Sequence, residues 1–164
     1  MKKTETPKLN TIEKVVVNVG LGKMSQRPNF EEKILPEVMK EVAAITGQKP
    51  AVAKAKKSIA GFKLRTGQVI GLKVTLRKKR MNDFLERFKR VVLPRLRDFR
   101  GISQGSVDKS GNLTIGLREY TVFPEINQEN SKYDFGVEIT IVSKVRDRNK
   151  AVEMFREIGI PLQK

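Results

Sequence analysis

The side chains able to do chemistry in this chain are mainly lysines and arginines. Its 164 residues contain 34 Lys and Arg against 18 Asp and Glu, with no histidine and no cysteine. The usual acid/base group near neutral pH is therefore missing, and disulfides and thiolate metal sites are excluded. Carboxylate pairs such as Glu153 with Glu157 fall on expected helix faces among cations, where pairing between neighbouring turns explains them. The composition predicts no catalytic residue, no metal site and no cofactor.

A glycine pair after the first expected strand resembles a nucleotide-binding loop only superficially. Gly20 and Gly22 stand in the sequence GLG, but the third glycine, the lysine and serine of a phosphate loop and a later acidic residue are all missing. These glycines indicate the end of a strand.

The positive charge is concentrated in the middle of the chain. Residues 1–48 hold 8 basic and 6 acidic side chains, residues 49–100 hold 17 and 3, and residues 101–164 hold 9 and 9, so the middle supplies +14 (17 − 3) of the net +16. Residues 42–82 contain eleven cations and no acid. A solvated surface normally mixes both signs, so this segment predicts contact with a polyanion, foremost a nucleic acid.

Two other classes of protein remain as alternatives. A nucleic-acid-modifying enzyme would need a carboxylate cluster for magnesium or a lysine nucleophile in a cleft, and no acid lies between Glu41 and Asp83. A protein of anionic membrane surfaces would need a basic amphipathic helix with apolar aromatics, which the sequence lacks. No apolar run approaches the length of a membrane span, so we expect a soluble, intracellular protein. The length of the chain predicts one domain, residues 1–164, with residues 1–12 as a flexible leader.

Periodicity predicts an α+β fold. Alternation indicates strands over residues 13–20, 49–55, 69–77, 103–107, 113–118 and 136–144, and apolar stripes indicate helices over residues 30–45, 81–92 and 147–158. Asn29 with Glu32 can form a capping box, while Pro36 either kinks that helix or marks a later start. Pro94 ends or bends the second helix, and Asp147 can cap the third. We expect an antiparallel sheet with helices packed on one face and a long, flexible basic loop over residues 54–68.

The open face of that sheet is the expected binding surface. Asn18, Thr75 and Arg77 occupy the polar positions of strands expected to be neighbours, where an amide, a hydroxyl and a guanidinium can contact ribose and phosphate. In the basic loop, Phe62 either stacks on a base or anchors the loop to the core, and anchoring is favoured. The cations at residues 78–80 stand at the expected start of a helix, where the positive end of the helix dipole repels them. A negatively charged partner outside the helix can compensate this repulsion.

Several separate motifs resemble one family. They are GQKPAVAKAKKSIAGFKLRTGQVIGLKVTLR (residues 47–77), PRLRDFRG (residues 94–101), and GN, GLRE and FPEI between residues 111 and 126. In this order they closely resemble the large-ribosomal-subunit protein five family, the bacterial-type 5S-rRNA-binding proteins, from about residue 15 onward. The resemblance implies a non-catalytic ribosomal component that attaches 5S rRNA within the central protuberance of the cytoplasmic ribosome. Implied partners are 5S rRNA, 23S rRNA, P-site tRNA, small-subunit protein thirteen and neighbouring 5S-binding ribosomal proteins, with no membrane and no homo-oligomer.

The resemblance also implies roles for individual residues. The family's contacts to 5S rRNA fall by motif on Asn18, Gln48, Thr75 and Arg77. The loop that reaches P-site tRNA and rRNA corresponds to residues 56–67, including Lys56, Lys57, Ser58, Phe62, Lys63 and Arg65. The intersubunit bridge corresponds to Arg97, Asp98, Arg100, Arg118 and Glu119. Bacterial members usually begin with an amphipathic helix before the first strand, and here a short polar leader is expected instead.

Overall fold

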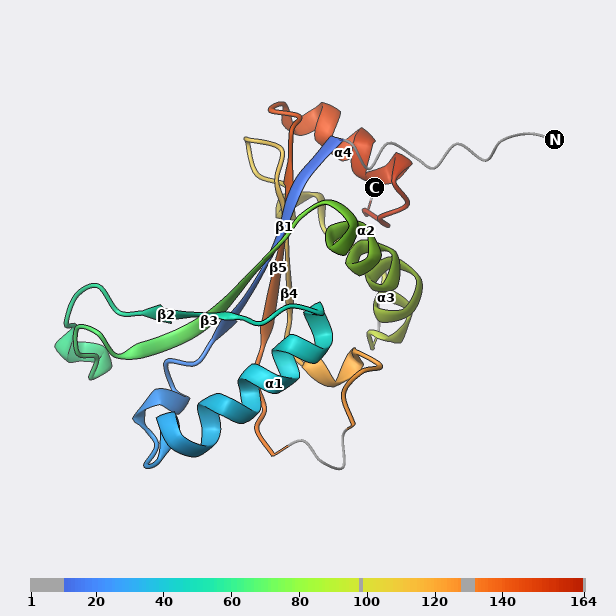
Figure 1. Ribbon diagram of the computed structural model, residues 1–164. Coiled ribbons are helices and arrows are strands. Elements are labelled where there is room, and N and C mark those ends of the chain that lie inside the picture. The colour runs from blue at the N-terminus through green and yellow to red at the C-terminus, as the bar shows by residue number, and fades with distance from the viewer. Residues whose placement is uncertain (1–10, 98, 128–131, 164) are drawn as a thin grey trace. The chain divides into compact units, whose positions relative to one another are not determined.

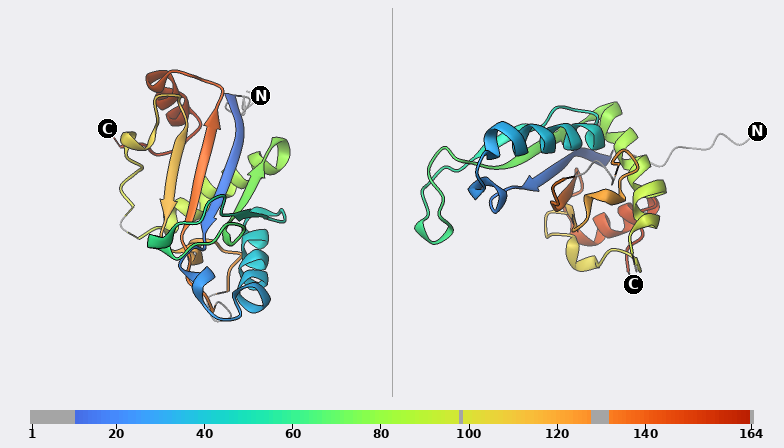
Figure 2. Two further views of the ribbon diagram at one scale, coloured as in Figure 1. Left: turned by 90° about the vertical axis from the view of Figure 1, so that its left-hand side faces the viewer. Right: turned by 90° about the horizontal axis from the view of Figure 1, so that it is seen from below.

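Five strands form one sheet in the order β2-β3-β1-β5-β4. The computed structural model describes residues 11–97, 99–127 and 132–163. Strand β1 (Ile12–Gly20) lies between β3 (Val69–Leu76) and β5 (Val137–Ser143), while β2 (Ala51–Lys54) and β4 (Leu113–Leu117) form the two edges (Figure 1 and Figure 2). The sheet is antiparallel, and β2 pairs with β3 through Ala51 opposite Lys73 and Ala53 opposite Gly71. The predicted α+β class is confirmed.

One face of the strands is buried and the other is open. Along β1, Val15, Val17 and Val19 are at most 2% exposed, whereas the side chain of Asn18 between them is half-buried. Strands β4 and β5 alternate in the same way, with buried Leu113 and Ile139 beside exposed Thr114 and Glu138. Because successive strand residues point to opposite faces, this burial leaves a polar face free for a ligand.

Contacts divide the chain into two compact units. The first unit comprises residues 1–16, 76–115 and 139–164, and the second comprises residues 17–75 and 116–138. The second unit carries α1 (Leu35–Thr46), which buries Val38, Val42 and Ile45 and ends at Gly47, whose φ of 67° is easily adopted only by glycine. The first unit carries α2 (Lys78–Arg87), α3 (Leu93–Arg95) and α4 (Arg148–Glu157). At the start of α4 the side chain of Asp147 accepts a hydrogen bond from the Lys150 amide at 2.9 Å, the predicted cap.

Pro36 and Pro94 each follow a widened helical turn. A π-helical turn, Phe30–Ile34, precedes α1 with Pro36 in its first turn, and another, Phe88–Val92, precedes α3 with Pro94. Proline donates no amide hydrogen, and its ring clashes with the carbonyl four residues earlier in an α-helix. In a π turn the hydrogen bonds join residues five apart, so the chain avoids the α-helical spacing that causes this clash. The predicted capping box of Asn29 is wrong, because Asn29 has a left-handed φ of 57° and its side chain makes no cap hydrogen bond.

The predicted strand over residues 103–107 is also wrong. This segment contains a short 3₁₀ turn, Gln104–Ser106, and Val107 forms only an isolated bridge with Leu113. Its carbonyls are taken by a side chain from α4, since Arg148 donates to the oxygens of Gln104 at 3.1 Å and Val107 at 3.2 Å. The amides of Ser106 and Val107 also donate to the carbonyls of Ser103 and Gln104, at 3.0 and 3.1 Å, so these backbone groups close a turn instead of pairing with another strand. Alternation alone is therefore misleading here.

Candidate nucleic-acid interface

The open face of the second unit brings Asn18 together with an acidic residue. Asn18 is on β1 and its Nδ2 donates to Oε1 of Glu138 on the neighbouring β5, at 3.4 Å. Both are on the open side of their strands. Glu138 is not among the residues predicted from the sequence, although its position between Val137 and Ile139, which are both buried, indicates the open face.

Gln48 and Thr75 are held together by a side-chain hydrogen bond. Nε2 of Gln48 donates to the carbonyl oxygen of Thr75 at 3.3 Å, and Thr75 is half-buried near the end of β3. Gln48 itself follows the end of α1, where its amide donates to Oγ1 of buried Thr46 at 3.4 Å. Two of the residues expected to contact RNA therefore occupy one place on the second unit.

Arg77 directly follows β3 and is exposed. It is the N-cap residue of α2, with an extended backbone (φ −138°, ψ 160°) and no side-chain cap hydrogen bond. Its guanidinium therefore has no part in starting the helix and remains available for a ligand. The helix begins with Lys78, Lys79 and Arg80 and has no acid in its first turn, as the sequence indicated.

The cations of residues 42–82 are all exposed. They comprise Lys49, Lys54, Lys56, Lys57, Lys63, Arg65, Lys73, Arg77, Lys78, Lys79 and Arg80. Apart from Arg80, none of them forms an ion pair with a carboxylate in the described part of the chain. Among the described residues, the charge of the other ten is therefore not neutralised by ion pairs, which favours a strong local positive potential.

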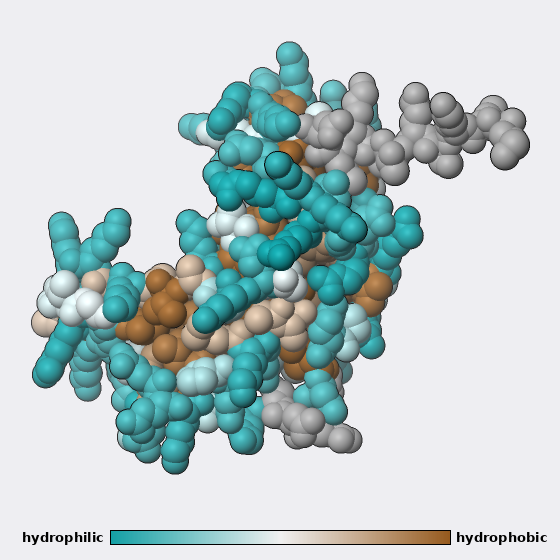
Figure 3. All heavy atoms as spheres, viewed as in Figure 1, coloured by the Kyte–Doolittle hydropathy of each residue, from teal (hydrophilic) through white to brown (hydrophobic). Residues whose placement is uncertain are grey.

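The basic loop is a hydrogen-bonded hairpin. Ile59 and Leu64 form an antiparallel bridge around the turn Ala60–Phe62, and Ser58 Oγ accepts from the Thr66 amide at 3.0 Å. The loop leaves the second unit beyond β2 and β3 (Figure 1 and Figure 2), and hydrophilic side chains project from it in Figure 3. The predicted anchoring of Phe62 in the core is wrong, because its side chain is 68% exposed.

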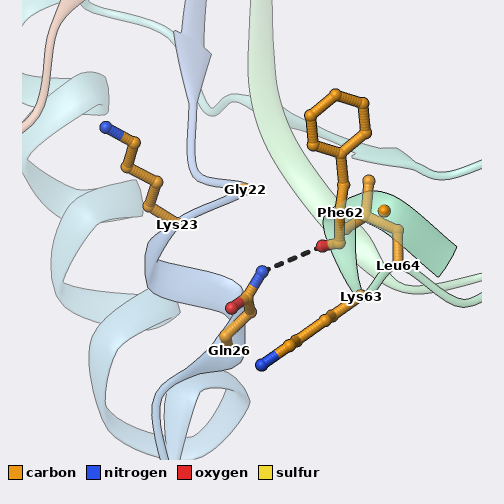
Figure 4. A pocket seen from close by; sticks show the side chains of 7 residues that line it. Gly22, Lys23, Gln26, Phe62, Lys63 and Leu64 are labelled. Carbon is orange, nitrogen blue, oxygen red and sulfur yellow. Dashed lines mark hydrogen bonds between the residues drawn. The ribbon is translucent and has the colours of Figure 1, made fainter. Parts of the chain in front are cut away.

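Two glutamines connect this loop to the segment that follows β1. Gln26 donates through Nε2 to the carbonyl oxygen of Phe62 at 3.0 Å (Figure 4). At the base of the loop, Gln68 donates to Ser25 Oγ at 3.1 Å and accepts from the Arg65 amide at 3.1 Å. The backbone of Phe62 is thus held while its ring stays exposed.

The residues expected at an intersubunit bridge are divided between the two units. Arg97 and Arg100 are exposed in the first unit, Arg118 and Glu119 are exposed in the second, and Asp98 lies outside the described residues. Next to Glu119, the ring of Tyr120 is 1% exposed and stacks on Phe135 with centroids 3.8 Å apart. Its hydroxyl donates to the Tyr133 carbonyl at 2.7 Å, and burial raises the pKa of Tyr120 to about 12.

No group of His, Cys, Asp and Glu within the described ranges is arranged to hold a metal ion. None of the described helices is long and apolar enough to cross a membrane. The candidate interface consists of an open polar strand face and a basic hairpin in the second unit, and of the exposed Arg77 in the first unit.

Comparisons with known proteins agree with the sequence motifs. Residues 7–65 match the model described as ribosomal protein L5, and residues 69–162 match the model of the C-terminus of the same ribosomal family. The large ribosomal subunit protein uL5 of Halothermothrix orenii is 47% identical over 92% of this chain and 82% of its own length. Proteins of the same name from Carboxydothermus hydrogenoformans and Fusobacterium nucleatum are 44% and 46% identical over 99% and 98% of the chain, and 87% and 84% of their own lengths. The chain therefore belongs to the ribosomal protein L5 family, whose members are structural components of the ribosome and not enzymes.

Proposed function

We propose that this chain, as a structural constituent of the large ribosomal subunit, binds 5S rRNA through Asn18, Gln48, Thr75 and Arg77. The observation that carries the proposal is a run of exposed cations together with an open polar strand face. Apart from Arg80, these cations form no ion pair with a carboxylate among the described residues. Phosphate contacts supply most of the affinity in such an interface, and polar groups such as the amide of Asn18 supply contacts to bases and ribose. Bound in this way, the protein helps attach 5S rRNA in the central protuberance, beside 23S rRNA and other 5S-binding proteins.

The basic hairpin is proposed to reach the P-site tRNA. Support comes from its exposed Lys56, Lys57, Lys63 and Arg65 and from the exposed ring of Phe62, which suits stacking on an unpaired base. The hydrogen bonds of Gln26 and Gln68 hold the backbone of this hairpin in place, which lowers the entropy that the backbone loses on binding.

The bridge to small-subunit protein thirteen is proposed for Arg97, Arg100, Arg118 and Glu119. The four side chains are exposed and charged, as a polar contact between subunits requires. Asp98 belongs to the same proposal by its motif alone.

A binding experiment tests the main proposal. The full chain is titrated into labelled 5S rRNA and, in parallel, into a folded RNA of equal length and unrelated sequence, at several salt concentrations. We expect tighter binding to 5S rRNA, with the logarithm of the association constant falling by about 0.7 to 0.9 per logarithm of salt for each phosphate contacted. Equal affinity for both RNAs, or binding that salt does not weaken, would refute the proposal.

A further inference from the structure

The open face of the second unit contains a hollow of about 480 Å³. Asn18, Lys73 and Glu138 supply its polar side chains, and Gly20, Gly71, Gly116 and Gly136 supply much of its floor. Strands β1, β3, β4 and β5 all contribute, because these residues are on the open side of neighbouring strands. We call this set of residues the glycine hollow.

Internal packing accounts for one of these glycines but not for all. A Cβ at Gly71 would meet the Val19 carbonyl oxygen at 2.6 Å, so glycine is required there by the adjoining strand. A Cβ at Gly116, within β4, or at Gly20 would meet nothing within 4 Å, and neither residue has a positive φ. Glycine weakens a strand interior and often marks close approach by a ligand. The open space above Gly116 and Gly20 therefore points to something that enters from outside.

The charge on the hollow indicates which part of a nucleic acid enters. Glu138 is a carboxylate on a face whose neighbours, Lys73 included, are positive or neutral. A carboxylate repels phosphate and accepts hydrogen bonds, so its partner must present donors. Guanine is the base that offers two adjacent donors, N1–H and the N2 amino group, on its Watson–Crick edge, and unpaired bases expose that edge in RNA. A carboxylate can accept both at once.

Asn18 orients that acceptor. Its Nδ2 donates to Oε1 of Glu138 at 3.4 Å, and no described residue donates to Oε2. The amide thus holds one side of the carboxylate while the other stays directed to a ligand.

We propose that the glycine hollow receives an unpaired guanine of the bound RNA, whose N1–H and N2 amino group donate to Glu138, with Asn18 positioning the carboxylate. The proposal rests on the binding of 5S rRNA proposed above and adds a base-specific contact to it.

The first test changes the proposed acceptor, the carboxylate of Glu138, and the proposed donor, the N2 amino group of guanine, in separate steps. A set of 5S rRNAs is made in which single unpaired guanosines are replaced by inosine, which lacks the N2 amino group, and each is bound to the wild-type chain and to Glu138→Gln. For one position we expect inosine to weaken wild-type binding about tenfold or more, the range for a hydrogen bond to a charged group. For Glu138→Gln, which keeps one acceptor oxygen but loses the charge, the difference in affinity between the two RNAs should be much smaller than for the wild-type chain. Glu153→Gln, which removes an exposed carboxylate from α4, is the matched control and should keep the wild-type difference.

The second test fills the hollow without removing charge. Gly116→Thr should raise the melting temperature, because threonine favours a strand and its Cβ has open space, yet it should weaken 5S rRNA binding severalfold. Opposite signs on these two measurements are not expected from a substitution that only damages the fold.

The outcomes separate this inference from the main proposal. If Glu138→Gln binds 5S rRNA more tightly and no inosine position weakens wild-type binding, the carboxylate only repels phosphate and the guanine contact is refuted. If Arg77→Ala still weakens binding in that case, the proposed function stands alone. If the wild-type chain does not prefer 5S rRNA to a control RNA, the proposed function fails, and the inference fails with it.

Discussion

Replacing Arg77 by alanine should weaken 5S rRNA binding without unfolding the protein. Arg77 is exposed, its side chain makes no cap hydrogen bond to α2, and its backbone is in a conformation that alanine also adopts. The fold should therefore change in stability by no more than about 0.5 kcal/mol, as for other surface substitutions.

The loss in binding follows from the contact that the guanidinium can make. A charge-assisted hydrogen bond to phosphate contributes about 1.5 to 3 kcal/mol, which corresponds to a roughly 10- to 150-fold rise in Kd. One phosphate contact fewer should also lower the slope of log K against log salt by about 0.7 to 0.9. The two changes should appear together, because both report the same contact.

The assay measures the Kd for 5S rRNA of Arg77→Ala, Arg77→Lys and wild type at four or more salt concentrations. The free energy of unfolding of each protein is measured separately. Arg77→Lys should keep the slope and lose part of the affinity, since lysine keeps the charge but not the two-pronged geometry. Lys33→Ala is the control, because Lys33 is exposed beside Glu31 and Glu32, where its charge is locally balanced. An Arg77→Ala chain that binds with wild-type Kd and slope would show that Arg77 lies off the RNA surface.

Three further predictions concern the fold that presents the site. Gly71→Ala should destabilise the protein by about 1 to 3 kcal/mol in urea unfolding, because its Cβ would lie 2.6 Å from the Val19 carbonyl oxygen; an unchanged midpoint would contradict that contact. Gln68→Ala should speed hydrogen exchange of the Leu64 amide, which bonds to Ile59, since the loop loses its tie to Ser25; equal exchange would show that the tie is dispensable. Tyr120→Phe should cost about 1 kcal/mol near pH 8, through the lost hydrogen bond to Tyr133. In the folded protein the pKa of Tyr120 is raised to about 12 from 10.0, so the stability that Tyr120 contributes is complete below pH 10 and falls between pH 10 and 12. The difference in unfolding free energy between wild type and Tyr120→Phe should therefore narrow over that range. A constant difference would argue against the raised pKa.

Periodicity identified most of the elements because each buries only one side. The valines of β1, the stripe of α1 and the cap of α4 are local patterns, and local patterns survive in the fold when burial on one face outweighs other interactions. Where a distant group intervened, the prediction failed. Arg148 takes the carbonyls of residues 104 and 107, and the turns before Pro36 and Pro94 widen into π-helical turns that no periodicity reveals.

In the candidate site, too, local patterns predict some residues, whereas contacts between distant residues decide the place of others. Motif and alternation indicated Asn18, Thr75 and Arg77, and the structure shows Asn18 and Thr75 on the neighbouring strands β1 and β3 with Arg77 exposed after β3. Gln48 was placed by motif alone, and its hydrogen bond to the Thr75 carbonyl spans 27 residues of sequence. Phe62 was expected in the core, yet its ring is exposed, and the loop is held through the Phe62 carbonyl by Gln26 instead.

The sequence by itself determined the charge of this protein, its lack of histidine and cysteine chemistry and the alternation that leaves one strand face polar, because these depend on residue type and local order. Only the tertiary structure decided which polar residues meet. Glu138 is 120 residues from Asn18 and reaches it across adjacent strands, and the glycines of the hollow are gathered from neighbouring strands of the sheet. Strand order and register are set by packing of the whole chain, so a surface assembled across strands is not encoded in any single segment.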